Sequence, residues 1–300
     1  MSSMSRKATL FILVLLSLMQ IIIMSSTAVL SSSTTMLSYG TIDYSGMASL
    51  VYSTSFEDAI KVGNKLNLPV AHMFGLQNGG TFWVENTTNP TPGAPNPRTG
   101  QKCIGMSLPA GTGTQRSEFA FGFFTNPTWS EIGDELFTSV WLYLPSDWDL
   151  HSTGWNWFEI INSFVCTPGM GGDYPRLKWH IDRSGNSGSY FARIFWATDA
   201  GEAGVLLREI NPFVVPKGEW FNIKTYTYRH ETNGTMKVWL TSSYYGTNYV
   251  IVDASGYQTK YPGEEDWYTS FAKSYMSGDG YEHKMWVDDV EIWNARPPGF

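Results

Sequence analysis

Short runs in which apolar and polar residues alternate recur along most of this chain, and they constrain its fold more than any other feature. In Leu177–Asp182, for example, apolar residues alternate strictly with Lys178, His180 and Asp182. Successive side chains of a strand lie on opposite faces, so one face can contact a core while the other carries ionisable groups. The same pattern predicts strands over Leu50–Phe56, Thr81–Glu85, Lys102–Leu108, Gln115–Phe123, Glu135–Leu144, Trp155–Phe164, Arg176–Arg183, Tyr190–Thr198, Gly204–Glu209, Trp220–His230, Thr235–Thr241, Tyr249–Asp253 and Lys284–Trp293.

Helical periodicity is scarce by comparison. It predicts short helices only over Asp58–Leu66 and Glu264–Tyr275. Strands and helices do not alternate in the rhythm that builds a parallel sheet. The sequence therefore predicts an all-β fold of two stacked antiparallel sheets, a sandwich or jelly roll.

The N-terminal region has the layout of an export signal. Residues 1–28 begin with two cations and no acid, continue with the apolar run Ala8–Met24 and end on small residues. Cleavage would give a secreted, extracellular protein. An uncleaved segment would tether the protein to a membrane, because the run reaches the lower limit of length for a span. A Ser/Thr-rich linker is expected over residues 29–45, followed by one β domain over residues 46–300.

Composition narrows the class of partner. The formal net charge of −7 argues against nucleic acid, which favours a basic surface. Aromatic residues make up 15% of the chain, with 13 Trp and 16 Tyr, and exposed rings of these types stack on the apolar faces of sugars. An extracellular polysaccharide is the expected partner, and no protein partner is inferred.

Two further features suit an exported protein. Cys103 and Cys166 are the two cysteines, and they could form one disulfide or remain as buried free thiols. Asn86 and Asn233 begin glycosylation sequons.

Applied to the other predicted strands, the alternation collects aromatic and charged side chains on the polar faces. If these strands share one sheet, their outer faces form a single concave groove. The residues expected in it are Arg116, Glu118, Trp141, Tyr143, Trp157, Glu159, Lys178, His180, Asp182, Lys224, Tyr226 and Tyr228. An ordinary solvated sheet face is the alternative interpretation.

The chain also contains, in order, the segments Arg116–Phe119, Val140–Pro145, Gly218–Lys224 and Trp286–Trp293. Their pattern and order resemble concanavalin A-like jelly-roll polysaccharide lyases, the group that includes alginate and glucuronan lyases. The resemblance covers roughly Leu50–Trp293 and implies a concanavalin A-like sandwich that acts on a polysaccharide. Alginate lyases of this fold typically carry a Gln-Ile-His element, which is absent here. They also carry Tyr-x-Lys-x-Gly-x-Tyr, whose nearest equivalent in this chain is Lys224–Tyr228.

A lyase removes the proton next to a uronate carboxylate and expels the 4-linked sugar. It needs a cation or amide at the carboxylate, a base at C5 and an acid at the leaving oxygen. Arg116 is the candidate cation, His180 or Tyr226 the base, and Tyr226 or Tyr228 the acid. The residues predicted to bind substrate are Glu118, Trp141, Tyr143, Trp157, Glu159, Lys178, Asp182 and Lys224.

Two other functions remain open from the sequence. A retaining or inverting glycoside hydrolase would use Glu118 and Glu159 as its pair of carboxylates, although the Glu-x-Asp-x-x-Glu strand motif of jelly-roll glucanases is absent. A non-catalytic carbohydrate-binding module would use the same groove for stacking alone.

No cofactor is required for either chemistry. A structural calcium ion is a separate expectation, because the first and last strands of such jelly rolls often meet and their acids can supply oxygen ligands. Glu57 and Asp288 are the predicted ligands. The chain has no His/Cys spacing typical of zinc sites, no glycine-rich phosphate loop and no Gly-x-Ser-x-Gly element.

Overall fold

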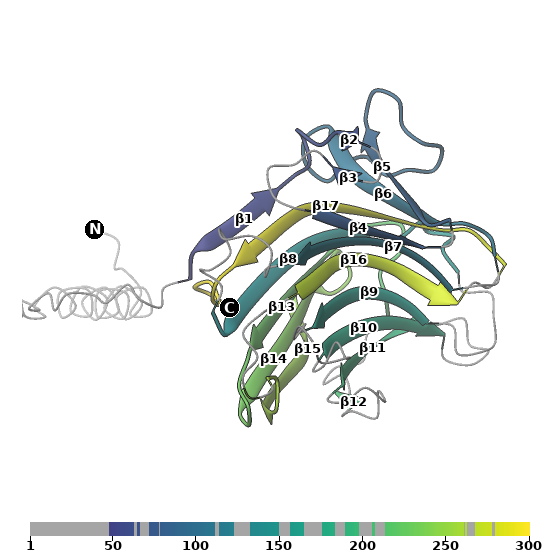
Figure 1. The fold of residues 1–300 in the computed structure, drawn as a ribbon. Coiled ribbons are helices and arrows are strands. Elements are labelled where there is room, and N and C mark those ends of the chain that lie inside the picture. Colours follow the sequence, from purple (N-terminus) through teal and green to yellow (C-terminus); the bar gives the residue numbers. More distant parts are fainter. Residues whose placement is uncertain are drawn as a thin grey trace, which may run out of the picture. The chain divides into compact units, whose positions relative to one another are not determined.

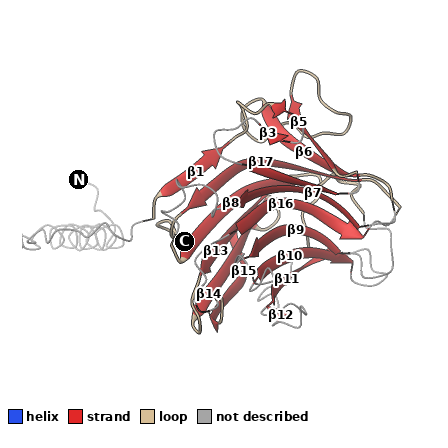
Figure 2. Ribbon diagram, in the orientation of Figure 1, coloured by secondary structure: helices blue, strands red, loops and turns tan. Residues whose placement is uncertain are grey.

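All secondary structure in the part of the chain that the structure describes is β-strand (Figures 1 and 2). The computed structural model describes residues 48–62, 65–66, 72–77, 79–111, 114–122, 133–149, 157–164, 176–183, 190–197, 206–207, 214–260, 262, 268–277 and 280–300. The predicted signal over residues 1–28 and the linker over residues 29–45 lie outside these ranges. No helix within them is long and apolar enough to cross a membrane.

Eight strands form the first of two large antiparallel sheets. Its strand order is β15-β14-β13-β8-β17-β6-β5, and β1 also pairs with β17. These strands are β1 (Leu50–Thr54), β5 (Thr81–Asn86), β6 (Lys102–Leu108), β8 (Glu135–Tyr143), β13 (Trp220–Tyr228), β14 (Gly234–Ser242), β15 (Gly246–Tyr257) and β17 (His283–Trp293).

Seven strands form the second large sheet, in the order β12-β11-β10-β9-β16-β7-β4. They are β4 (His72–Gln77), β7 (Thr114–Gly122), β9 (Trp157–Phe164), β10 (Arg176–Arg183), β11 (Tyr190–Ala197), β12 (Leu206–Leu207) and β16 (Tyr268–Ser277). A small hairpin pairs β2 (Lys61–Val62) with β3 (Lys65–Leu66). Figure 1 shows both large sheets as curved layers, and β6 and β17 of the first contact β7 and β16 of the second. The predicted antiparallel jelly roll is confirmed.

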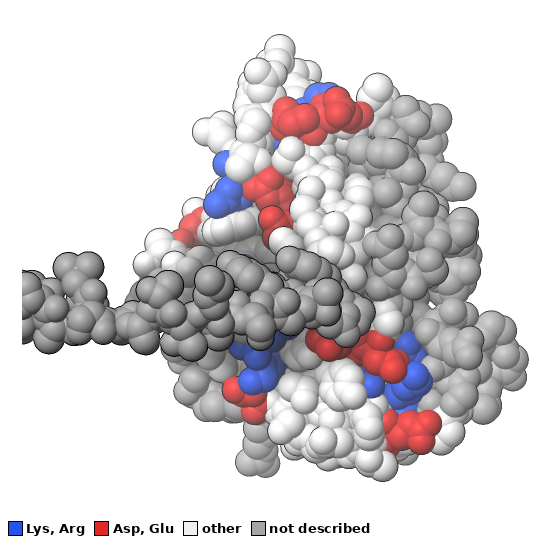
Figure 3. Space-filling model, turned by 90° about the vertical axis from the view of Figure 1, so that its left-hand side faces the viewer, with Lys and Arg blue, Asp and Glu red and all other residues white. Residues whose placement is uncertain are grey.

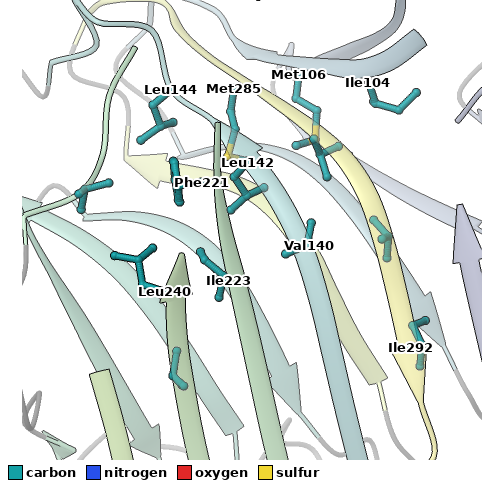
Figure 4. Packing of buried hydrophobic residues seen from close by; sticks show 14 of the residues in the cluster. Ile104, Met106, Val140, Leu142, Leu144, Phe221, Ile223, Leu240, Met285 and Ile292 are labelled. Carbon is teal, nitrogen blue, oxygen red and sulfur yellow. The ribbon is translucent and has the colours of Figure 1, made fainter. Parts of the chain in front are cut away.

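One face of the eight-stranded sheet carries a continuous apolar core. Alternate residues of neighbouring strands, such as Leu142, Phe221 and Met285, are completely buried and lie in one layer (Figure 4). Burial of each such side chain stabilises the fold by about 1.5–3 kcal/mol. The alternation within Glu135–Tyr143 and Trp220–Tyr228 therefore assigns the inner face as predicted.

The opposite face of the same sheet carries a row of aromatic side chains. Strand register aligns Trp83, Gly105, Trp286, Tyr143 and Trp220 across five strands. Gly105 cannot be replaced without a shift, because a Cβ there would lie 2.2 Å from the ring of Trp83. Trp83 and Trp286 meet edge to face with their ring centroids 6.1 Å apart, a favourable geometry for aromatic pairs.

The connection between β5 and β6 folds back over this aromatic row. Trp220 donates its indole Nε1–H to the carbonyl of Asn96 at 2.9 Å. The guanidinium of Arg98 lies 3.8 Å from the ring centroid of Trp141 and forms an ion pair with Asp289 at 3.1 Å. On the face seen in Figure 3, acidic and basic side chains lie in neighbouring clusters rather than in one basic stripe.

Both predicted helices are wrong. The second, Glu264–Tyr275, overlaps the strand Tyr268–Ser277, which is hydrogen-bonded to β7 on one side and β9 on the other. Pairing on both edges outweighs local helix propensity, which is a weak determinant in a tertiary context. The first predicted helix, Asp58–Leu66, covers the two short strands of the β2–β3 hairpin.

Cys103 is a free thiol with 0% exposure. Burial, with Asp288 nearby, raises the pKa of this thiol, so it is an inert core residue. Cys166 lies outside the described ranges. Of the two sequon asparagines, Asn233 is exposed, and glycosylation stays a prediction at both.

Tyr52 provides a test of burial at the meeting of the first and last strands. Burial raises the pKa of its phenol from the ordinary 10.0 to about 12. Between these two pH values the unfolded chain loses the proton first, so the stability of the protein falls as pH rises. We expect Tyr52→Phe to remove about 1–2 kcal/mol of this alkaline loss, a figure reduced for partial exposure. Urea unfolding of wild type and variant at both ends of the window measures it. An equal loss in both proteins would contradict the burial, and Tyr281→Phe, at an exposed tyrosine, is the matched control.

Candidate functional site

The seven-stranded sheet unites seven of the twelve residues predicted for the groove. They come from three of its strands and are Arg116, Glu118, Trp157, Glu159, Lys178, His180 and Asp182. Directly paired residues of neighbouring strands share a face. His180 pairs with Glu159, and Asp182 pairs with Trp157. The register of β16 links Glu159 of β9 to Arg116 of β7. All seven therefore lie on one face of one sheet.

A single line of paired positions crosses six adjacent strands on this face. It runs from β4 through β7, β16, β9 and β10 to β11, and we call it the polar row. Its members, in strand order, are Gln77, Arg116, Tyr275, Glu159, His180 and Arg193. Neighbouring strands are about 4.8 Å apart. The row thus places two cations, a phenol, a carboxylate, an imidazole and an amide at successive positions along one line.

Sequence reasoning missed four residues of this face. Tyr275 and Lys273 belong to the segment predicted as a helix, and Gln77 lies on β4, which was not predicted. Arg193 lies on a predicted strand whose faces were not assigned. The spacing of Lys273 and Tyr275, two positions apart, was the available signal, because residues at that spacing share a face of a strand.

The register also defines the residue paired with Lys273 on the neighbouring strand. Lys273 pairs directly with Glu118 of β7, and opposite charges at paired positions stabilise a sheet by roughly 0.2–1 kcal/mol. Glu118 is therefore paired with a lysine position, whereas Tyr275, two positions further along β16, stands between Arg116 and Glu159 in the register.

The expectation that all twelve residues share one sheet is wrong. Five of them belong to β8 and β13 of the eight-stranded sheet, on the face opposite its core: Trp141, Tyr143, Lys224, Tyr226 and Tyr228. Alternation predicts which face of a strand a residue occupies, but it carries no information about which strands pair.

Each of these five side chains already has a partner in or beside the eight-stranded sheet. Tyr226 donates its hydroxyl to Glu135 at 2.8 Å, and burial followed by that hydrogen bond raises the pKa of its phenol. Lys224 donates to Asn248 at 2.8 Å, and burial lowers the pKa of its ammonium group. With Arg98 stacked on its ring, Trp141 has one face covered. The nearest equivalent of the lyase tyrosine element, Lys224–Tyr228, is therefore in the other sheet from Arg116.

A hollow against the eight-stranded sheet lies beside Trp141. It has a volume of about 650 Å³ and is bordered by the segment 52–58, by Arg98 and by Asp289. The Arg98–Asp289 ion pair crosses its rim. The hollow brings together none of the residues of the polar row.

Glu57 and Asp288, the predicted calcium ligands, both accept hydrogen bonds from the β5–β6 connection. Glu57 accepts from the backbone N–H groups of Gln101 and Lys102 at 3.0 Å each, and Asp288 accepts from that of Arg98 at 2.9 Å. Calcium takes six to eight oxygens, and no group of three His, Cys, Asp or Glu that could hold a metal occurs in the ranges the structure describes. These hydrogen bonds anchor the β5–β6 connection to Glu57 and Asp288. Calcium binding stays a prediction.

Comparison with known proteins bears on the fold. No protein-family model matches the chain, and no curated protein is significantly similar to it. Its structure is similar to that of an endo-β-1,4-glucuronan lyase from the fungus Trichoderma reesei, with a TM-score of 0.53 and 14% identity over 81% of this chain and 95% of that one. The chain has the concanavalin A-like jelly-roll fold.

Two further structures are similar at lower scores. An alginate lyase from Chlorella virus has a TM-score of 0.37 and 10% identity, over 64% of this chain and 84% of that one. A GH131 β-glucanase catalytic domain from Podospora anserina has a TM-score of 0.39 and 10% identity, over 64% and 71%.

Proposed function

We propose that this protein is a polysaccharide lyase that cleaves a uronate-containing polysaccharide by β-elimination on its seven-stranded sheet. The polar row carries the proposal, because it places Arg116, Tyr275, Glu159 and His180 at successive paired positions of adjacent strands. A lyase site needs a cation at the substrate carboxylate and two groups that transfer protons. All three kinds of group occur within four neighbouring strands.

Each residue has a role in the proposed reaction. Arg116 neutralises the uronate carboxylate, so that negative charge can develop on it as the C5 proton leaves. Tyr275, at the adjacent position, takes that proton or delivers one to the leaving oxygen, and His180 serves the other transfer. The bond from C4 to the glycosidic oxygen breaks, a double bond forms between C4 and C5, and the leaving oxygen gains a proton. Arg193 and Lys178 offer further positive charge to neighbouring carboxylates of the polymer.

The arrangement favours a lyase over a hydrolase. A hydrolase would rely on Glu118 and Glu159 as a carboxylate pair, but these residues lie on β7 and β9, which are separated by β16. The residue paired with Glu118 on β16 is Lys273, which is a cation rather than a second carboxylate. The residue directly between Arg116 and Glu159 is Tyr275, and a phenol there suits proton transfer rather than a two-carboxylate mechanism.

The substrate to test first is polyglucuronate, because a solved structure with this fold is that of a glucuronan lyase. Mature protein would be incubated with polyglucuronate, alginate and neutral glucans while ultraviolet absorbance follows the unsaturated uronate product. A rise with a uronate polymer is expected. New reducing ends without that absorbance would make the protein a hydrolase, and binding without cleavage would make it a binding module. Either result would overturn the proposal.

We also propose that the protein is exported, with residues 1–28 as the signal. This proposal rests on the sequence of that segment alone. N-terminal sequencing of the protein recovered from the medium tests it.

A further inference from the structure

A small pocket lies at the tight turn between β14 and β15, in the sheet that does not carry the polar row. Its volume is about 290 Å³, and its walls are Val214, Val215, Pro216, Glu219, Tyr244 and Tyr245. Tyr244 is 82% exposed and Val214 is 50% exposed, so a large apolar surface faces solvent here. Exposed aromatic surface of this kind, with polar groups at its edge, is typical of ligand sites.

The walls of this pocket are held in place by specific contacts. Tyr244 and Tyr245 meet edge to face with their ring centroids 4.8 Å apart, and Tyr245 in turn lies 4.9 Å from the ring of Tyr249. The backbone N–H of Val214 donates to the hydroxyl of Tyr245 at 2.6 Å. These contacts tie the segment before β13 to the β14–β15 turn, so the aromatic wall is preorganised and binding costs little ordering.

Glu219 places one carboxylate at the edge of the aromatic wall. The backbone N–H of Ser243 donates to Oε2 of Glu219 at 3.0 Å. This bond orients the carboxylate and does not involve its other oxygen, Oε1. An apolar ring face beside an oriented acceptor matches the chemistry of a sugar, which has an apolar C–H face and hydroxyl donors at its rim.

The charge at this pocket selects between classes of polysaccharide. A uronate polymer would bring carboxylates next to Glu219, and like charges at such a contact are unfavourable. We propose that the pocket binds a neutral sugar residue of a polysaccharide, as a second carbohydrate site separate from the polar row. It would hold the protein on a neutral glycan that accompanies the uronate polymer.

The test is affinity electrophoresis of the full chain through gels that contain a soluble β-glucan, a xylan or a glucomannan. At least one of them should retard the wild-type protein. Tyr244→Ala should weaken that binding about tenfold, because an aromatic ring contributes stacking as well as buried area. Tyr244→Trp should keep it, and Tyr281→Ala, at another exposed tyrosine outside the pocket, should leave it unchanged.

Two results would overturn this inference. They are the absence of retardation by every neutral glycan, and equal retardation of wild type and Tyr244→Ala. Its failure is separable from that of the proposed lyase function, because Arg116→Ala should still bind the neutral glycan and Tyr244→Ala should still cleave short uronate oligosaccharides at the wild-type rate. Thermal unfolding of Tyr244→Ala, expected to match wild type, shows whether the fold is intact.

Discussion

Replacement of Arg116 by alanine is expected to lower the rate of uronate-polymer cleavage about 10³-fold. The β-elimination builds negative charge on the substrate carboxylate, and a fixed donor aimed at such charge contributes about 10²–10³-fold when it is a neutral hydrogen-bond donor. A full cation should reach the upper end of that range. Initial rates of ultraviolet absorbance with polyglucuronate measure the effect.

Arg116→Lys and Lys237→Ala are the matched variants for this prediction. Lysine keeps the charge but loses the planar two-point contact with a carboxylate, so Arg116→Lys should fall between wild type and Arg116→Ala. Lys237 pairs with Asp253 at 2.8 Å on the other sheet, so its removal takes away a cation without touching the proposed site. Equal rates for Arg116→Ala and Lys237→Ala would contradict the assignment of Arg116.

Tyr275→Phe is expected to lower the rate about 10²–10⁴-fold, the range that positioned proton transfer contributes. Tyr275 stands between Arg116 and Glu159 in the register. Phenylalanine keeps the ring but lacks the hydroxyl group that would transfer the proton. The strand should tolerate the change, because both residues favour β-structure.

Tyr226→Phe is the natural comparison for that variant. Tyr226 donates to Glu135 within the eight-stranded sheet, so its loss should cost about 0.5–1.5 kcal/mol of stability and leave the rate near wild type. The sequence alone favoured Tyr226, and the strand pairing favours Tyr275. If Tyr226→Phe abolished cleavage and Tyr275→Phe did not, the division of residues between the two sheets would be wrong.

The sequence predicted the faces of individual strands well. The alternation in Leu177–Asp182 and in Trp157–Ile160 placed His180 and Glu159 on polar faces, and the register puts them opposite each other. Every predicted strand overlaps an observed one. The core residues of β8 and β13 followed from the same alternation, because burial of one face is a local property of the pattern.

The sequence could not predict which strands are neighbours. The two sheets each contain polar faces, and nothing local distinguishes Tyr226 on β13 from Tyr275 on β16. Pairing is set by long-range contacts, such as that of β16 with β7 more than 140 positions earlier in the chain. The aromatic residues of the eight-stranded sheet illustrate the same limit, because the Arg98 contact that covers one face of Trp141 comes from a distant connection.

The measurement that tests the central claim most directly is cleavage of polyglucuronate in heavy-oxygen water, with the products read by mass spectrometry at short times. In β-elimination the leaving sugar keeps the glycosidic oxygen, so the account predicts products with one unsaturated end and no heavy oxygen at the new reducing ends. Hydrolysis inserts an oxygen from water. Heavy oxygen at the reducing ends, with saturated products, would contradict the lyase mechanism and with it the roles given to Arg116 and Tyr275.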